Sequence, residues 1–279
     1  MNLFNKELIL PFKQKKVIKI ISGLNNLNVK NIIRIAKAAE MSNASYIDIV
    51  ANTKMTVLLK RFTSIPICVS SINPIELYNC VLAGANLVEI GNFDSFYKKN
   101  IFFSTNQILC LAKETRSLLK YTDICVTIPH NLNLYEQKYL AKQLESIGIN
   151  ILQTEAPKYY NINNFNMNQK CKYDKVFGSI QKAAFSLYLT YILSNTVDIP
   201  VITASNLDSI SSLVAISCGA SGVGIGSSIK NYKNIYNMSK YIDEIYYSLD
   251  KYQDNKNITN IFLQKAINKL LSGNYIKLL

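Results

Sequence analysis

The sequence predicts a single (β/α)₈ barrel, an α/β fold in which parallel strands and helices alternate around a closed sheet. From Val17 onward, short runs rich in Ile and Val alternate with amphipathic stretches, and the alternation repeats eight times. Each run is apolar on both faces, as the strands of a buried parallel sheet are. The predicted strands are 17–22, 46–51, 67–70, 87–90, 124–128, 151–154, 201–204 and 223–226.

The stretches between these strands carry apolar residues at helical spacing and capping residues at their ends. Pro74 follows Asn73 as a first-turn proline should, and Asn133 with Glu136 has the spacing of a capping box. A further helix at 258–272 is predicted either to cover the barrel floor or to pair with another subunit in a homo-oligomer. The other predicted helices are 29–40, 53–62, 74–83, 105–119, 134–147, 176–196, 207–217 and 235–252.

An internal repeat favours a closed barrel over an open, doubly wound sheet. Segments 43–52, 84–92, 148–156 and 219–227 align without gaps as a helix end, two linker residues and a strand. They belong to the second, fourth, sixth and eighth units, and no switch point interrupts the series. Barrels near 250 residues commonly form one domain. We therefore expect one domain over 1–279, with the barrel at about 17–250 and a C-terminal helical extension at about 251–279.

Composition and cysteine spacing narrow the class of protein. Of the 279 residues, 49% are hydrophobic and 18% are charged, and no run approaches the ~20 apolar residues of a membrane span, so no membrane association is predicted. The six cysteines lack C-x-x-C spacing, which predicts free thiols and no disulfide framework. His130 is the single histidine, which disfavours a zinc site built on histidines.

The net charge of +13 raises the question of nucleic-acid binding, because clustered Lys and Arg neutralise phosphate backbones. Here the lysines are spread along the chain, and no recognition motif accompanies them. Lys, Asn, Ile and Tyr are abundant together while Trp is absent, which is the residue bias of an AT-rich genome. Nucleic acid is therefore disfavoured as a partner.

One position of the repeat carries acidic or amide side chains. The second, fourth and sixth strands place Asp48, Glu89 and Gln153 there, and the eighth places Gly224. An acid facing the apolar helix layer would be desolvated at a cost of several kcal/mol, so these side chains are predicted to face the lumen. Lys19 on the first strand is predicted to join them, either in a buried structural ion pair or as a base or Schiff-base amine.

Two further candidates lie nearer the mouth of the predicted barrel. Glu155 follows Gln153 by two residues and so shares its face, and His130 ends the fifth strand, where barrels place catalytic groups. His130 is predicted to act as an acid or base or, alternatively, to hydrogen-bond a loop. The polar interior is predicted to be completed by Thr127, Thr203 and Ser205. The candidate catalytic residues are Lys19, Asp48, Glu89, His130 and Glu155.

The segment GASGVGIGSSI (219–229) is a glycine-rich strand end that leads toward a helix. Such an end presents backbone N–H groups of Gly226, Ser227 and Ser228 to an anion, and the loops after strands seven and eight of barrels often bind phosphate. The seventh strand contributes Ser205 and Asn206. The alternative is that the glycines only permit tight strand-to-helix packing.

Two long loops are expected near the mouth. The loop 91–105 carries Asn92 and Asp94 beside aromatic residues, and the loop 156–175 is long enough to form a lid. An Asn- and Tyr-rich surface insertion is the competing interpretation of the second loop.

Six segments together resemble a known family. They are KIISGLNN (19–26), PICVSSINPIEL (66–77), VEIGNFDSFY (88–97), VTIPHNLNL (126–134), LQTEA (152–156) and ASGVGIGSSI (220–229). From about Val17 to Ile229 the chain resembles an uncharacterised family of TIM-barrel proteins encoded in algal plastid genomes and in cyanobacteria. The resemblance implies synthesis in the plastid (chloroplast) and a stromal location without import, and it implies no particular reaction.

The eighth-strand segment is also similar, more remotely, to that of barrels that act on sugar phosphates, such as epimerases and synthases. The chain departs from these in having Ser205 and Asn206 in place of Gly-Gly after the seventh strand. On the sixth strand it has Gln153 and Glu155 instead of the lysine of Schiff-base aldolases. A class I aldolase mechanism is therefore doubtful unless Lys19 substitutes.

These observations leave three function classes open. The first is a lyase, isomerase or epimerase that acts on a small phosphorylated metabolite by acid–base chemistry. The second is a barrel that binds a metabolite and regulates without turnover. The third is an oxidoreductase dependent on flavin mononucleotide, whose phosphate can use the same anchor. No particular cofactor follows from the residues. No metal site is assigned, although Asp48, Glu89 and Glu155 are Mg²⁺ ligands by chemistry.

Overall fold

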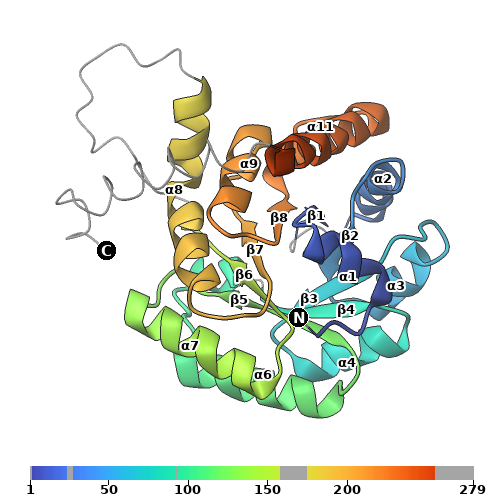
Figure 1. Cartoon of the computed structure of the whole chain (residues 1–279). Helices are drawn as coiled ribbons and strands as arrows, with labels where there is room; N and C mark the ends of the chain where they lie inside the picture. Colours follow the sequence, from blue (N-terminus) through green and yellow to red (C-terminus); the bar gives the residue numbers. More distant parts are fainter. Residues whose placement is uncertain (1, 24–27, 92, 158–174, 255–279) are drawn as a thin grey trace.

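The computed structural model describes residues 2–23, 28–91, 93–157 and 175–254, and its strands form a closed barrel surrounded by helices (Figure 1). Each strand pairs in parallel with the next, and the eighth pairs with the first. All eight predicted strands are confirmed, with ends that differ by at most two residues. The strands are β1 (Val17–Ile21), β2 (Tyr46–Val50), β3 (Ile67–Ser71), β4 (Leu87–Ile90), β5 (Asp123–Ile128), β6 (Ile151–Thr154), β7 (Val201–Ala204) and β8 (Gly222–Ile225).

The helices between the strands are those that apolar spacing predicted. Pro74 lies in the first turn of its helix with Asn73 as the cap, and Asn133 forms the capping box with Glu136. These helices are α2 (Val29–Glu40), α3 (Thr53–Leu59), α4 (Pro74–Leu82), α6 (Thr105–Leu118), α7 (Leu134–Ile147), α8 (Lys175–Ser194), α9 (Ser209–Ser217) and α11 (Ile235–Asp254). Three short helices were not predicted, namely α1 (Lys6–Lys13), α5 (Asp94–Tyr97) and α10 (Ser227–Lys230).

Two apolar cores follow from the alternation of side chains along the strands. The larger core fills the layer between the sheet and the helices and includes Ile18, Ile47 and Val88. The smaller core lies inside the barrel, where every second residue points inward. It consists of Leu8, Phe12, Val17, Tyr46, Cys68, Leu87, Cys125, Ile151 and Ile202. The lower lumen is therefore packed with side chains and is not a channel.

Helix α1 closes the floor of the barrel, at the amino ends of the strands. Its Leu8 and Phe12 belong to the core inside the barrel, and Asn5 caps the helix by accepting a hydrogen bond from the N–H of Glu7 at 3.0 Å. The carboxylate of Asp123 on β5 accepts the backbone N–H groups of Phe4 at 2.9 Å and Asn5 at 2.8 Å. The sequence offered the 258–272 helix as one candidate for this role, and that segment lies outside the described residues.

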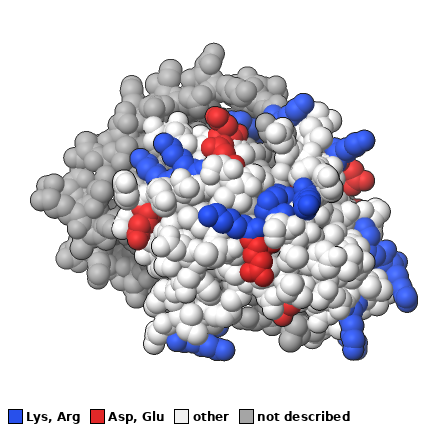
Figure 2. All heavy atoms as spheres, turned by 90° about the horizontal axis from the view of Figure 1, so that it is seen from below, with Lys and Arg blue, Asp and Glu red and all other residues white. Residues whose placement is uncertain are grey.

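The surface and the cysteines agree with the composition. Figure 2 shows Lys and Arg side chains spread over the face seen from below, with Asp and Glu between them, and no continuous basic stripe on that face. In the part of the chain that the structure describes, none of the helices combines the length and the apolar character needed to cross a bilayer. The five described cysteines are free thiols.

Candidate functional site

Lys19 lies at the centre of the barrel, and its ammonium group contacts three acceptors from three strands. It donates to Oε2 of Glu89, to Oε1 of Gln153 at 2.7 Å and to Oδ2 of Asp48 at 3.0 Å. An ammonium group has three N–H donors, so its hydrogen-bonding capacity is filled. The prediction that these three strands turn one shared position toward the lumen is confirmed, and Lys19 joins them there.

The two carboxylates of this cluster are also held by neutral donors. Oε1 of Glu89 accepts from Oγ1 of Thr127 at 2.8 Å and from Nε2 of Gln153 at 2.8 Å. Oδ1 of Asp48 accepts from Oγ of Ser70 on β3 at 2.6 Å. We call Lys19, Asp48, Ser70, Glu89, Thr127 and Gln153 the lumen network. Every member is buried and hydrogen-bonded, and with both acids ionised the network carries one net negative charge.

The ionisation of the lumen network follows from burial and from its charges. Burial disfavours the charged form of Lys19, but attraction to Asp48 and Glu89 outweighs burial and raises the pKa of Lys19 well above its ordinary value. Burial raises the pKa of Asp48 to about 6, against the opposing attraction of Lys19. Lys19 is therefore a fixed cation, and Asp48 is an acid whose charge changes near pH 6.

Gly91 makes room for the side chain of Glu89. A Cβ at this position would lie 2.6 Å from Oε1 of Glu89 and 3.0 Å from Oγ1 of Thr127, which is closer than side chains tolerate. Gly91 follows Glu89 by two residues and so continues the inward-facing alternation of β4. Any larger residue here would have to displace the carboxylate or the hydroxyl that holds it.

A second ionisable cluster lies directly toward the mouth. Glu155 follows Gln153 by two residues, which places it roughly 7 Å further along the strand direction. Its Oε2 lies 3.1 Å from Nδ1 of His130, accepts the backbone N–H of His130 at 3.3 Å and accepts the hydroxyl of Tyr97 at 2.7 Å. Both candidates that the sequence placed near the mouth are thus brought together, with Tyr97 as a third member.

The loops after β7 and β8 are joined at the mouth. Ser205 and Asn206 follow β7 with φ values of 75° and 59°, left-handed conformations that cost about 1–3 kcal/mol each and cluster at ligand sites. Oγ of Ser228 donates to the carbonyl of Leu207 at 2.5 Å. Gly226 precedes α10 and has no side chain to cap it, so the first backbone N–H groups of this short helix receive no side-chain cap.

One expectation about a polar residue is wrong. Thr203 does not complete the polar interior, because Oγ1 of Thr203 lies 2.6 Å from Oγ1 of Thr190 on α8, outside the sheet. Its neighbour Ile202 points inward instead, as part of the smaller core inside the barrel. Asp48, Glu89 and Glu155 do not converge on one point, because Glu155 is bound to His130 and Tyr97 while the other two hold Lys19.

Among the described residues, Asp48, Cys68 and Glu89 place ligand-type atoms within 4.8 Å of one another. The ammonium of Lys19 is bonded to both of these carboxylates and supplies the positive charge that a cation would bring. Burial raises the pKa of the Cys68 thiol well above its usual range, so this sulfur stays protonated and is a poor metal ligand. The residues therefore fit an ammonium better than a metal ion.

Three members of these clusters had not been predicted from the sequence. Ser70 pairs with Glu89 in the β3–β4 register, and strand alternation carried through β3 would have placed it in the lumen. Gly91 continues the alternation of β4 in the same way. Tyr97 lies on the four-residue helix α5, for which no periodic signal exists. Residues 158–174 of the loop predicted to be a lid or a surface insertion lie outside the described residues, as does Asn92.

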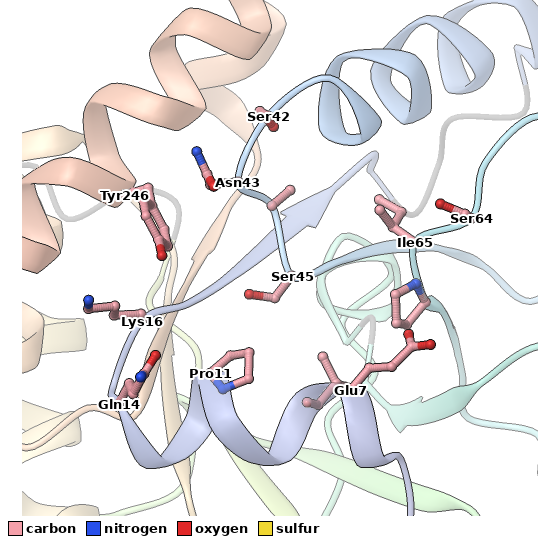
Figure 3. A pocket seen from close by; sticks show the side chains of 13 residues that line it. Glu7, Pro11, Gln14, Lys16, Ser42, Asn43, Ser45, Ser64, Ile65 and Tyr246 are labelled. Atoms are coloured by element: carbon pink, nitrogen blue, oxygen red, sulfur yellow. The ribbon is translucent and has the colours of Figure 1, made fainter.

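A cavity of about 470 Å³ lies at the opposite end of the barrel (Figure 3). Its wall is formed by α1, by Lys16 before β1, by Ser45 before β2 and by Tyr246 of α11, which places it at the amino ends of the strands. Oγ of Ser45 accepts the backbone N–H of Ile18 at 3.0 Å, so this residue of the cavity wall links the beginnings of β1 and β2. The ionisable clusters described above lie at the other end.

The fold and the site together define a (β/α)₈ barrel whose buried charges lie in the lumen and at the carboxyl ends of the strands. The chain belongs to the family described as protein of unknown function (DUF561), whose profile matches residues 3–255. A relative from Antithamnion sp., the uncharacterized protein ycf23, is 49% identical over 255 residues, which cover 90% of this chain and 91% of the relative. The family resemblance drawn from the sequence is confirmed. Because ycf genes are plastid-encoded in algae, the relatives' names imply synthesis in the plastid.

Solved structures with the same fold are distant in sequence. The (S)-3-O-geranylgeranylglyceryl phosphate synthase from Thermoplasma acidophilum, solved with its substrate sn-glycerol-1-phosphate, matches with a TM-score of 0.57 and 11% identity, over 90% of this chain and 99% of that chain. The thiamine phosphate pyrophosphorylase from Pyrococcus furiosus matches with a TM-score of 0.54 and 13% identity, over 86% and 98%. At this identity the likeness shows the (β/α)₈ fold.

Proposed function

We propose that this protein binds a small phosphorylated metabolite at the mouth of the barrel and converts it by proton transfer, as a lyase, isomerase or epimerase. The observation that carries the proposal is the pairing of His130 with Glu155 directly above the lumen network. His130 is 18% exposed, so a ligand in the mouth can reach the ring while Glu155 orients it from below. Structural neighbours that are named for phosphorylated compounds support the class of ligand.

The lumen network would act as fixed electrostatics in this proposal. The hydrogen bonds within the network hold its charges in place, so they would need no reorganisation during a reaction at the mouth. Asp48, whose pKa is about 6, would be the member of the network whose charge depends on pH. Gly91 supports this arrangement because it makes room for the Glu89 carboxylate and the Thr127 hydroxyl that holds it.

The phosphate would lie between the loops after β7 and β8. The first turn of α10 would offer the backbone N–H groups of Gly226, Ser227 and Ser228 to the anion. Ser205 and Asn206 have strained conformations in the loop after β7. The hydroxyl of Ser228 joins this loop to the one after β8. The hydroxyl of Ser228 already donates to Leu207, so the backbone is the expected donor.

Two variants of similar size, one charged and one neutral, test the phosphate position. Gly226→Asp brings a negative charge next to the proposed phosphate position, and Gly226→Asn has nearly the same size without the charge. In a thermal-shift screen of metabolites offered with and without their phosphate, we expect stabilisation of the unsubstituted protein by phosphorylated members only. Gly226→Asp should abolish that stabilisation and Gly226→Asn should keep most of it. Equal effects of both variants, or no phosphorylated stabiliser at millimolar concentration, would count against the site.

A second candidate function is metabolite binding without turnover, and the completeness of the lumen network favours it. All three N–H donors of Lys19 are engaged and Lys19 is wholly buried, which is also what a structural ion cluster requires. Glu89→Gln separates the two functions once a ligand is known. Affinity retained within about threefold, with no turnover detected in either form, would favour binding alone.

The stroma is the compartment that we propose for this function. The relatives' plastid-type names support synthesis inside the organelle. Fractionation of isolated plastids with an antibody to this chain tests it: recovery with the stromal proteins is expected, and recovery with the membranes would overturn the proposal.

A further inference from the structure

One oxygen of Glu155 gathers donors from two other elements of the barrel. Its Oε2 accepts the hydroxyl of Tyr97, on α5 after β4, at 2.7 Å. The same oxygen lies 3.1 Å from Nδ1 of His130, which follows β5, and accepts the backbone N–H of His130 at 3.3 Å. Glu155 itself follows β6 and its side chain is 9% exposed. Loops after three consecutive strands thus meet on one carboxylate oxygen.

Tyr97 also fixes the imidazole from the side. Its ring meets the ring of His130 edge to face, with centroids 4.7 Å apart and planes at 85°. The Tyr97 ring also stacks on the ring of Phe102, with centroids 5.4 Å apart. The ring of Phe93 lies nearby, with its centroid 6.5 Å from that of Tyr97. These aromatic neighbours hold the Tyr97 ring independently of its hydroxyl, so removing the hydroxyl alone would leave the ring in place.

The protons of this cluster can be assigned from the chemistry of its groups. An ionised carboxylate only accepts hydrogen bonds, so the nitrogen that faces Glu155 carries the hydrogen. In neutral His130 that nitrogen is Nδ1, and Nε2 then holds the lone pair. A neutral imidazole can carry its hydrogen on either nitrogen, and the groups that the two nitrogens contact decide which one carries it.

We propose that His130, Glu155 and Tyr97 form one proton-transfer unit in which Nε2 of His130 exchanges the proton with the ligand and Tyr97 is a positioning residue. Tyr97 acts through Glu155: its hydroxyl holds Oε2 in the orientation that receives Nδ1–H. The inference deepens the proposed acid–base function and adds a residue from the loop after β4 to the site. Its test needs no ligand.

The single histidine makes the unit directly observable, because every imidazole signal in the protein belongs to His130. The ¹⁵N chemical shifts of the ring distinguish the two neutral tautomers, and they are read at a pH where the ring is uncharged. We expect the Nδ1–H tautomer to predominate in the unsubstituted protein. A predominant Nε2–H tautomer would overturn the proposal.

Two variants test the roles of the carboxylate and the hydroxyl. Glu155→Gln keeps the shape but removes the charge, and the ratio of Nδ1–H to Nε2–H should fall about tenfold, because a charge-assisted hydrogen bond becomes a neutral one. Tyr97→Phe should lower the same ratio about threefold, since one neutral hydrogen bond to Glu155 is lost. Tyr135→Phe, the same change on the exposed face of α7, should leave the ratio unchanged.

Failure of this inference is distinguishable from failure of the proposed function. An unchanged tautomer ratio in Tyr97→Phe, with the protein folded by circular dichroism, would remove Tyr97 from the unit. Such a result would not affect the stabilisation by phosphorylated metabolites that tests the anion site. Conversely, loss of every ligand effect with the Nδ1–H tautomer intact would leave the proton assignment standing and overturn the phosphate site.

Discussion

Gln153 completes the hydrogen bonding of Lys19, with its amide oxygen 2.7 Å from the ammonium nitrogen. The amide nitrogen of the same side chain donates to Glu89 at 2.8 Å and to Thr127 at 3.1 Å. A neutral side chain therefore bridges the cation and one of its two acids, and it fixes how both are oriented. The lumen network holds two acids around one ammonium, so it has one more acidic group than basic groups. The first two predictions below concern how the stability of the protein depends on these charges.

Removing the cation should destabilise the protein strongly. Lys19→Met leaves Asp48 and Glu89 buried side by side without their partner, and breaking a buried ion pair on one side costs about 3–5 kcal/mol. Urea unfolding measures the loss, with Lys113→Met on the exposed face of α6 as the control. A second substitution, Glu89→Gln in the Lys19→Met background, should recover part of the stability. A loss below about 1 kcal/mol would contradict the buried ion cluster.

The stability of the protein should fall between about pH 4 and pH 6 through Asp48. Its pKa is about 6 in the folded protein and about 3.9 in an unfolded chain, so the folded state holds the proton more tightly. Stability from this group is complete below the unfolded value and is lost as the pH rises through the folded value, by about 3 kcal/mol.

Asp48→Asn imitates the protonated acid and should lack this pH dependence. Unfolding free energies of both proteins are measured in urea across the same pH range. The unsubstituted protein should lose stability relative to the variant as the pH rises. Parallel pH curves would show that Asp48 does not titrate in this range.

A side chain at position 91 should disrupt the lumen network, because it would collide with the carboxylate of Glu89. Gly91→Ala puts a methyl group 2.6 Å from Oε1 of Glu89, and overpacking of this kind typically costs about 1–3 kcal/mol. Gly178→Ala is the matched control, because a Cβ at this position in α8 meets nothing within 4 Å. Alanine should stabilise the helix there by about 0.5–1 kcal/mol. Thermal unfolding should therefore move in opposite directions in the two variants, and equal shifts would refute the steric argument.

The floor of the barrel should depend on one face of α1. Phe12 is 2% exposed and packs inside the barrel, whereas Leu10 on the same helix is 61% exposed. Phe12→Ala should cost about 3–5 kcal/mol and Leu10→Ala less than about 0.5 kcal/mol. The difference in urea midpoint between the two variants is the measurement. Similar midpoints would show that α1 does not plug the lumen.

The strands and the charged lumen could be predicted because both depend on alternation along short apolar segments. Asp48, Glu89 and Gln153 revealed which face of their strands is inward, since an acid cannot face the apolar helix layer. Thr203 was misplaced because β7 reads VITA, and a strand that is buried on both faces hides which residues point inward.

The residues that could not be predicted come from segments without periodicity. Tyr97 reaches Glu155 from a four-residue helix, and its position depends on the packing of Phe93 and Phe102, which are close in the fold and carry no repeat. Helix α1 has only eight residues and contains Pro11, so its single apolar face gave too short a pattern. Its burial is decided entirely by tertiary contacts.

The docking of α1 also sets an order of events during synthesis. Leu8 and Phe12 precede all eight strands in the chain, yet the core that buries them includes Ile202 on β7, and the acid that anchors the preceding segment is Asp123 on β5. During synthesis the apolar face of α1 therefore cannot be fully buried until seven of the eight strands exist. A helix that is made before the strands is thus buried only after most of them.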